Sequence, residues 1–219
     1  MKTEGLKVNV LGDSITYGVG TSAEQYRFCD LLKKECGFAE VRNYGMSGTR
    51  FARQTECAAA GNDCDGNFCA RAEKMDPDAD VIIVFGGTND YGHGNAPVGG
   101  SYDRTRDTFC GACHELFSEL LTAYPAATVV VVTPMHRADE VTPYENFRTE
   151  APLPLSAFVS IIRDVAAYYS IPVFDAFARC GIQPAIDAQK EIFAPDGAHP
   201  NDAGNARFCR QLISFLKTL

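Results

Sequence analysis

VIIVFGGTND, residues 81–90, consists of five consecutive apolar residues followed by a glycine-rich polar turn. A second apolar run, TVVVVT, occupies residues 128–133. Runs that are apolar throughout, without alternating polar residues, are typical of strands buried on both faces, as in parallel sheets covered by helices. The two stretches therefore predict the centre of a parallel β-sheet.

Around these central strands, short β-branched runs alternate with longer segments whose apolar residues recur every three or four positions. Strands are predicted at Lys7–Leu11, Glu40–Tyr44, Val81–Phe85, Thr128–Thr133 and Pro172–Phe174. Helices are predicted at Tyr26–Glu35, Arg104–Ala123, Leu155–Tyr169 and Ala203–Leu216. This alternation predicts an α/β three-layer sandwich with right-handed crossovers. A chain of 219 residues fits a single domain spanning 1–219.

Three stretches between these elements lack regular periodicity: Thr55–Ala79, Tyr91–Asp103 and Met135–Pro154. Long loops in a compact domain are often functional. In an open α/β sheet, the loops at the carboxyl ends of the strands border the ligand crevice. The second and third stretches follow central strands, so we expect both to overhang that crevice.

The composition restricts the classes of partner. A net charge of −8 argues against nucleic acid as the main partner, because phosphate binding needs clustered Lys and Arg. No apolar run approaches the roughly 20 residues needed to span a bilayer. The N-terminus shows no pattern of a secretory signal, so we expect a cytoplasmic protein. The sequence does not indicate an oligomeric state.

The nine cysteines are expected to be reduced and mostly buried. Cys110-Gly111-Ala112-Cys113-His114 has the spacing of a c-type haem attachment site, but it falls in a predicted helix that should pack on the sheet. A zinc site drawing on Cys110 and Cys113 with Cys57, Cys64 and Cys69 lacks regular paired spacing. We therefore expect no metal and no cofactor.

Two short motifs at opposite ends of the chain carry the candidate chemistry. Gly12-Asp13-Ser14 follows the first predicted strand, where a serine can be exposed at the carboxyl edge of the sheet. Asp196 precedes His199 by three residues, just ahead of the last predicted helix. On one turn, Asp196 can accept a hydrogen bond from His199 Nδ1, which leaves Nε2 available to take the serine proton.

Two further motifs follow neighbouring strands and offer hydrogen-bond donors. Gly48 lies in the segment after the second strand, and Asn89 lies in the turn after the third. Ester hydrolysis develops negative charge on the carbonyl oxygen, and each donor held in place for that charge contributes roughly 3–4 kcal/mol. Either motif alone is also compatible with an ordinary turn.

Taken together, these motifs resemble the sequence blocks of the SGNH, or GDSL-type, hydrolase superfamily. Gly12-Asp13-Ser14 resembles the first block, Gly48 the second, Gly87-Thr88-Asn89-Asp90 the third, and Asp196-Gly197-Ala198-His199 the last. The resemblance implies a flavodoxin-like, five-stranded parallel sheet. It implies Ser14 as nucleophile, His199 as base and Asp196 as the orienting acid. It also implies an oxyanion hole formed by the Ser14 and Gly48 backbone N–H groups and the Asn89 side chain.

The predicted function is a serine esterase that hydrolyses short-chain, most simply acetyl, O-esters of a small molecule or a glycan through an acyl-enzyme. Asp13, Tyr91, His93 and His136 are candidates for contacting the substrate, because polar and aromatic loop residues suit a sugar-like alcohol. They are equally compatible with ordinary exposed loop residues. Two alternatives remain: a lipid hydrolase of the lysophospholipase or thioesterase type, and a non-catalytic carbohydrate-binding protein on the same fold.

Overall fold

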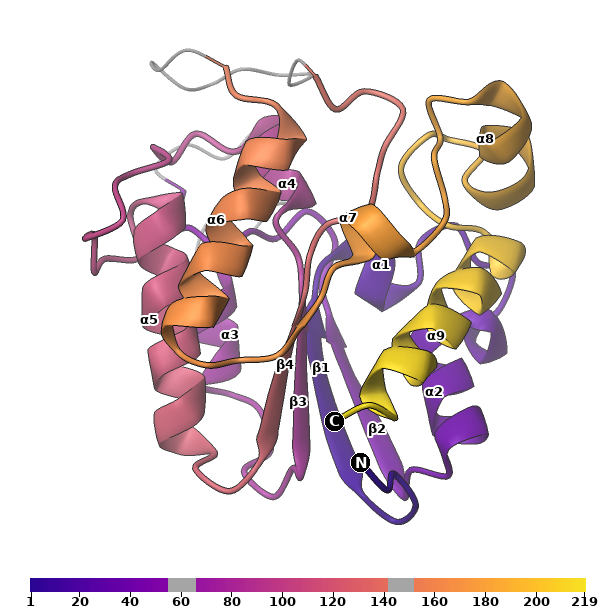
Figure 1. Cartoon of the computed structure of the whole chain (residues 1–219), viewed down its shortest axis with the longest axis horizontal. Helices are drawn as coiled ribbons and strands as arrows, with labels where there is room; N and C mark the ends of the chain where they lie inside the picture. Colours follow the sequence, from indigo (N-terminus) through magenta and orange to yellow (C-terminus); the bar gives the residue numbers. More distant parts are fainter. Residues whose placement is uncertain (55–65, 142–151) are drawn as a thin grey trace.

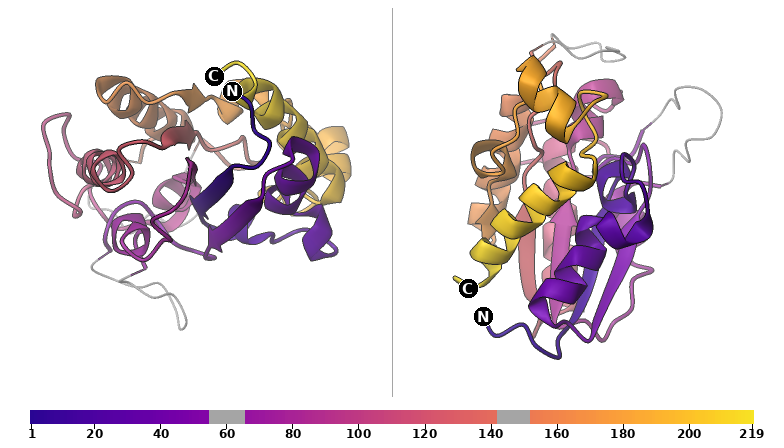
Figure 2. Two further views of the ribbon diagram at one scale, coloured as in Figure 1. Left: turned by 90° about the horizontal axis from the view of Figure 1, so that it is seen from below. Right: turned by 90° about the vertical axis from the view of Figure 1, so that its right-hand side faces the viewer.

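The computed structural model describes residues 1–54, 66–141 and 152–219, and its centre is a five-stranded sheet in which every pair is parallel (Figure 1). The strand order is β2-β1-β3-β4-β5. The strands are β1 (Lys7–Gly12), β2 (Glu40–Gly45), β3 (Val81–Phe85), β4 (Thr128–Val132) and β5 (Val173–Phe174). Helices cover both faces of the sheet, so the predicted α/β three-layer architecture is confirmed (Figure 2).

The register of the strands brings their carboxyl ends to one level. Gly12 pairs with Gly45 on one side and with Phe85 on the other, and Phe85 pairs in turn with Val132. The segments that follow β1, β2 and β3 therefore leave the sheet at the same edge. In Figure 1, the short helices α1 (Ser14–Tyr17), α4 (Thr88–His93) and α7 (Ala176–Arg179) lie at this edge.

Alternate residues of the central strands point into two separate hydrophobic cores. Ile82 and Val84 pack with α3 (Phe68–Ala72), α5 (Phe109–Ala123) and α6 (Leu155–Tyr168). On the opposite face, alternate residues of the same strand pack with two other helices. These residues are Val81, Ile83 and Phe85, and the helices are α2 (Phe28–Cys36) and α9 (Asp202–Leu216). Burial on both faces explains why these strands are apolar throughout.

The predicted helices form, but α5 begins later than predicted. It starts at Phe109 instead of Arg104, because Thr108 caps it by accepting a hydrogen bond from the Gly111 N–H at 3.2 Å. Thr108 is itself held by Asp103, which accepts from its hydroxyl at 3.0 Å. Residues 104–107 thus form a turn ahead of the helix, not its first turn.

Several short helices were not predicted from the sequence. They are α1, α3, α4, α7, α8 (Asp187–Phe193) and a 3-10 turn at Glu24–Tyr26. Two of them overlap stretches expected to be irregular: α3 lies within Thr55–Ala79, and α4 extends into Tyr91–Asp103. Helices of four to seven residues carry too few apolar positions for a 3.6-residue period to show. Residues 55–65 and 142–151 lie outside the described residues.

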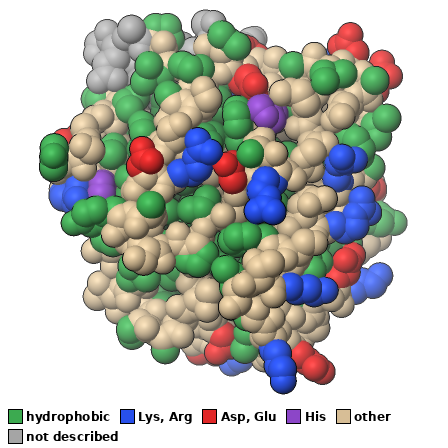
Figure 3. All heavy atoms as spheres, viewed as in Figure 1, with side chains coloured by type: hydrophobic (Ala, Val, Ile, Leu, Met, Phe, Trp, Pro, Cys, Tyr) green, Lys and Arg blue, Asp and Glu red, His purple; other side chains and the backbone are tan. Residues whose placement is uncertain are grey.

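The seven cysteines of the described ranges are free thiols, and all are buried: Cys29, Cys36, Cys69, Cys110, Cys113, Cys180 and Cys209. Cys57 and Cys64 lie outside the described residues. Among the helices of the described ranges, none is long and apolar enough to cross a membrane. Lys and Arg side chains are interspersed with Asp and Glu on the face shown in Figure 3, so no patch of one sign covers it.

Candidate active site

The nucleophile candidate lies where the central strand β1 turns into a short helix. Ser14 is the first residue of α1, and Asp13 caps that helix by accepting a hydrogen bond from the Ile15 N–H at 2.9 Å. Gly12 is required at this turn, since a Cβ there would come within 2.0 Å of Thr16 Oγ1. The tight turn leaves Ser14 with 6% of its surface exposed, at the carboxyl edge of the sheet.

The structure brings Ser14 together with the two residues from the other end of the chain. Ser14 Oγ lies 2.9 Å from His199 Nε2, and His199 Nδ1 lies 2.6 Å from Asp196 Oδ2. The second carboxylate oxygen of Asp196 accepts from the backbone N–H groups of Ala198 at 2.8 Å and of His199 at 2.7 Å. A hydroxyl, an imidazole and a carboxylate therefore form one continuous hydrogen-bonded chain.

These contacts also set the charge of Asp196. Burial alone would raise its pKa, but the hydrogen bonds from His199 and Ala198 outweigh burial and hold the pKa below its ordinary value. Asp196 is therefore a carboxylate at neutral pH. An ionised partner at Nδ1 fixes the tautomer of His199 that has an unprotonated Nε2 facing Ser14.

The segment that carries Asp196 and His199 is held on one side by the loop after β4 and at its end by the cap of α9. Gly197 adopts a positive φ of 84°, which favours glycine, and its carbonyl accepts from the Ala138 N–H at 2.7 Å. Asn201 caps α9 by accepting from the Gly204 N–H at 3.0 Å. Gly20 packs closely on the other side, since a Cβ there would lie 3.2 Å from His199 Cβ.

The candidate oxyanion donors lie on the neighbouring segments. Gly48 has a positive φ of 76°, and the next residue, Thr49, accepts through its carbonyl from the Asn89 side-chain amide at 3.0 Å. Asn89 is buried near the start of α4. The Ser14 N–H belongs to the first turn of α1, whose N–H groups lack intrahelical acceptors. The segment 46–52 and α4 are thus joined next to Ser14.

Two buried charged residues hold the segment of Gly48 in place, and sequence analysis did not assign either of them a role. Asp90 accepts from the backbone N–H groups of Phe51 and Ala52, both at 3.0 Å. Arg71, from α3, donates to Thr49 Oγ1 at 2.8 Å, to the Gly12 carbonyl at 3.0 Å and to the Tyr44 carbonyl. Arg71 therefore ties the end of β1, the end of β2 and the loop of Gly48 together.

No sequence signal singled out Arg71, because it lies far along the chain in a stretch expected to be irregular. Burial lowers the pKa of Arg71 to about 10, which leaves the guanidinium charged at neutral pH. Asp90 was visible in the motif after β3, but a carboxylate that binds backbone N–H groups cannot be told from an exposed one by sequence.

Asp13, a candidate for contacting the substrate, is 1% exposed and serves as the cap of α1. Burial raises its pKa to about 6, although the hydrogen bond from Ile15 and the nearby His199 act in the opposite direction. Its carboxyl group therefore points into the protein beneath Ser14.

The other three candidate substrate residues are placed in separate hydrogen-bonding groups. Tyr91 is buried against Phe158, and its hydroxyl donates to the Asp139 carbonyl at 3.3 Å. His93 Nδ1 lies 2.5 Å from an Arg50 nitrogen, and burial followed by the charge of Arg50 lowers the pKa of His93 to about 4.

His136 is half-buried and lies 2.8 Å from a Glu140 carboxylate oxygen, with its ring against Phe177. Tyr91, His93 and His136 form no hydrogen bond with Ser14, His199 or Asp196 among the contacts of the described residues. The remainder of the loop that follows β4, residues 142–151, lies outside the described residues.

The haem-like motif lies within α5, whereas the zinc hypothesis draws partly on Cys57 and Cys64, which lie outside the described residues. Cys113 and His114 are buried in α5, where both pack against neighbouring side chains. In the part of the chain that the structure describes, no group of three or more His, Cys, Asp or Glu could hold a metal ion.

The chain is similar to known proteins over almost its whole length. Residues 10–207 match the model of the GDSL-like lipase/acylhydrolase family. A protein from Lactobacillus plantarum of known structure is 28% identical, with a TM-score of 0.82 over 98% of this chain and 98% of that one. No curated protein matches the chain.

Two more distant structures share the fold. A carbohydrate acetylesterase from Sinorhizobium meliloti is 18% identical, with a TM-score of 0.67 over 97% of this chain and 99% of that one. An aryl esterase from M. smegmatis is 20% identical, with a TM-score of 0.68 over 98% of this chain and 100% of that one.

Proposed function

Because the chain belongs to the GDSL-like lipase/acylhydrolase family, we propose that it is a serine esterase in which Ser14, His199 and Asp196 form the catalytic triad. The observation that carries the proposal is the continuous hydrogen-bonded chain of these three side chains, with distances of 2.9 Å and 2.6 Å. A serine needs an adjacent base to become a nucleophile at neutral pH, and His199 Nε2 is in position to act as that base.

In the first step, Ser14 Oγ attacks the ester carbonyl carbon while His199 Nε2 takes the hydroxyl proton. His199 then gives this proton to the departing alcohol oxygen, and the acyl group remains on Ser14. In the second step, a water molecule loses a proton to His199 and attacks the acyl carbon. His199 then gives this proton to Ser14 Oγ as its bond to the acyl carbon breaks, which releases the acid and free Ser14. Asp196 stabilises the positive charge on His199 in both steps.

The negative charge that develops on the carbonyl oxygen needs donors fixed in advance. We assign this role to the Ser14 and Gly48 backbone N–H groups and to the Asn89 side chain. The support is the packing of the Gly48 loop, which Arg71 ties to the end of β1 and which Asp90 and Asn89 tie to α4. Donors held in this way do not have to reorganise as charge forms.

For the substrate, we propose a short acyl group, with acetyl as the simplest case, on a polar alcohol such as a glycan hydroxyl. A cavity of about 350 Å³ is lined by Gly20, which packs against His199, and by the polar side chains of Thr21, Ser22, Asn201 and Asp202. Such a lining suits a hydroxyl-bearing leaving group better than an alkyl chain. The fold shared with a carbohydrate acetylesterase is compatible with this choice.

The test is hydrolysis of p-nitrophenyl esters from acetate to decanoate by the wild type and by Ser14→Ala. We expect kcat/KM to fall with acyl length, and Ser14→Ala to reduce kcat by at least about 10⁴-fold, since it removes the nucleophile. Activity that survives in Ser14→Ala would exclude the mechanism. Activity that rises toward decanoate would favour a lysophospholipase or thioesterase instead.

A further inference from the structure

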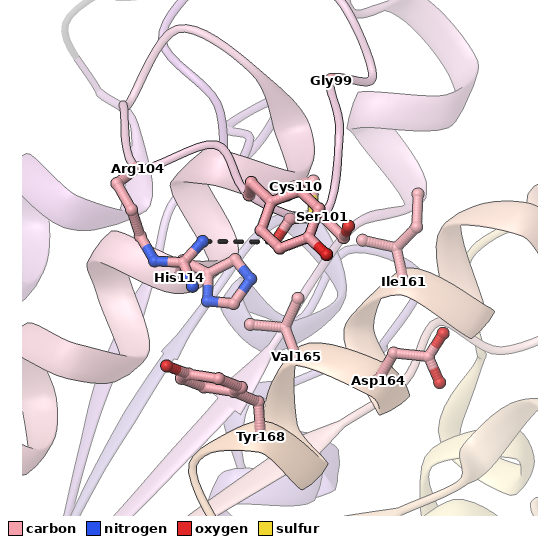
Figure 4. A pocket seen from close by; sticks show the side chains of 10 residues that line it. Gly99, Ser101, Arg104, Cys110, His114, Ile161, Asp164, Val165 and Tyr168 are labelled. Carbon is pink, nitrogen blue, oxygen red and sulfur yellow. Dashed lines mark hydrogen bonds between the residues drawn. The ribbon is translucent and has the colours of Figure 1, made fainter.

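A second cavity lies apart from the triad, between α5, α6 and the segment 99–104 (Figure 4). Its volume is about 390 Å³, which falls within the roughly 300–1,000 Å³ of small-molecule sites. None of the residues that line it forms a hydrogen bond with Ser14, His199 or Asp196 among the described contacts. The proposed reaction therefore does not account for it.

The inner wall of this cavity is apolar. Cys110 comes from α5, while Ile161 and Val165 come from α6, and all three line the space. Burial raises the pKa of the Cys110 thiol, so it remains neutral and packs as a small apolar group. The wall offers apolar contact to a ligand but no charge.

Two tyrosines that line the cavity expose most of their surface. Tyr102 is 93% exposed and Tyr168 is 68% exposed. The Arg104 guanidinium lies 5.5 Å from the centroid of the Tyr168 ring, which steadies that ring. Aromatic faces of this kind can contact the C–H face of a flat, ring-shaped ligand while leaving its edges for hydrogen bonds.

The charged groups of the cavity have opposite signs. Arg104 is oriented by donating to the Ser101 carbonyl at 3.3 Å and to the Asp103 carbonyl at 2.8 Å. In Figure 4, Arg104 and Asp164 lie on opposite sides, with Val165 between them. An anionic ligand would meet Asp164 and a cationic ligand would meet Arg104. A neutral hydroxyl group can accept from the guanidinium or donate to the carboxylate.

His114 adds no charge to this balance. It is 3% exposed, and burial followed by the charge of Arg104 lowers its pKa below the ordinary value for histidine. It is therefore neutral at neutral pH, with its ring edge-on to Tyr168 at 5.4 Å. The cavity thus combines an apolar wall, exposed aromatic rings, one positive charge and one negative charge.

We infer that this cavity is a second binding site, separate from the triad, that takes a neutral oligosaccharide. A sugar ring would lie against the tyrosine rings, with its hydroxyl groups between Arg104 and Asp164. The link to turnover rests on the proposed function, and it requires a glycan long enough to present its ester at Ser14 while it is held in this cavity. The binding of the sugar in this cavity does not depend on hydrolysis at Ser14.

The first test is calorimetric titration of the whole chain with xylotetraose, cellotetraose and maltotetraose. We expect at least one of them to bind, and Tyr102→Ala and Asp164→Asn each to raise its Kd at least ten-fold. Tyr26→Ala is the matched control, since Tyr26 is also exposed but lies outside the cavity. Absence of binding by all three sugars, or a Kd that neither variant changes, would overturn the inference.

The second test separates the cavity from the active site. Tyr102→Ala and Asp164→Asn should leave kcat/KM for p-nitrophenyl acetate unchanged and should raise KM for acetylated xylotetraose. If both variants have the same KM for acetylated xylotetraose as the wild type, the cavity does not contribute to turnover. Retained activity in Ser14→Ala would refute the proposed function but not the second binding site. The calorimetric titration decides independently whether the cavity binds sugar.

Discussion

The two sides of the active site are built in different ways. The base side, with Asp196 and His199, is a loop whose side chains are partly exposed and in which Asp196 accepts from the N–H groups of its own turn. The nucleophile side, with Ser14 and the loop of Gly48, rests on the buried charged side chains of Arg71 and Asp90.

Because of this difference, substitutions on the two sides should affect activity and stability differently. A residue on the exposed loop can be changed without leaving buried groups unsatisfied, so its loss should affect turnover and spare stability. A buried charged residue satisfies several backbone groups at once, and its loss leaves them without partners. We therefore expect substitutions on the nucleophile side to affect both properties.

Among the residues that orient or support the nucleophile and the base, the largest effect is expected on the base side. Asp196→Asn should lower kcat by about 10³–10⁴-fold, because the amide no longer fixes the tautomer of His199 that has Nε2 unprotonated. The free energy of unfolding should change by less than about 1 kcal/mol, since the carboxylate is half exposed. The measurements are p-nitrophenyl acetate kinetics and urea unfolding.

Asp187→Asn provides the control for this substitution, because Asp187 is exposed in α8 and contributes nothing to the triad. It should behave as the wild type in both measurements. A kcat for Asp196→Asn within ten-fold of the wild type would show that the carboxylate does not orient His199.

A smaller loss of activity, combined with a loss of stability, is expected on the nucleophile side. Arg71→Met removes the donor shared by the Gly12 carbonyl, the Tyr44 carbonyl and Thr49 Oγ1. Stability should fall by about 2–4 kcal/mol. The Gly48 loop is then free to shift relative to Ser14, and misplacement by about 1 Å costs about 10²-fold in kcat.

Arg71→Lys should recover part of the lost kcat, since an ammonium can still reach one or two of these acceptors. Arg106→Met is the matched control, because the Arg106 side chain makes partly exposed ion pairs with Glu73 and Glu119 and, among the described residues, no hydrogen bond with the Gly48 loop. If Arg71→Met unfolds more easily but keeps its kcat at temperatures where it is folded, Arg71 supports the fold without positioning the loop.

The same contrast explains how far the sequence could be interpreted. Ser14, Asp196 and His199 were identified because each occupies a short local motif, and the structure places them within hydrogen-bonding distance. The two central strands β3 and β4 were also predictable, since their valine- and isoleucine-rich runs are buried on both faces of the sheet. The other three strands were predicted from their shorter β-branched runs and their alternation with helices.

What the sequence did not reveal depends on long-range contacts. Arg71 acts on residues 22 to 59 positions earlier in the chain, and no local pattern marks such a contact. Tyr91 was expected to face the substrate, but it is buried against Phe158, whose position in α6 cannot be inferred from the loop itself. The late start of α5 likewise depends on Asp103 holding the cap residue Thr108.

Asp13 lies at the junction of the two sides, and its substitution should have the smallest effect on turnover. It is buried under Ser14, and its pKa is raised from 3.8 to about 6 by burial. The folded protein therefore holds this proton more tightly than the unfolded chain does. The resulting stabilisation is fully present below pH 3.8 and is lost as the pH rises through about 6.

Asp13→Asn should remove the loss of stability at higher pH, because the amide stays neutral and its oxygen can still accept from the Ile15 N–H. At pH 8 the variant should be more stable than the wild type by on the order of 2–3 kcal/mol, and near pH 4.5 the difference should shrink to about 1 kcal/mol. Urea unfolding at the two pH values measures this, and kcat should stay within a few-fold. An equal difference at both pH values would mean that the carboxyl of Asp13 does not titrate in this range. Asp13 would then be an ordinary helix cap, and burial would impose no cost on the nucleophile side.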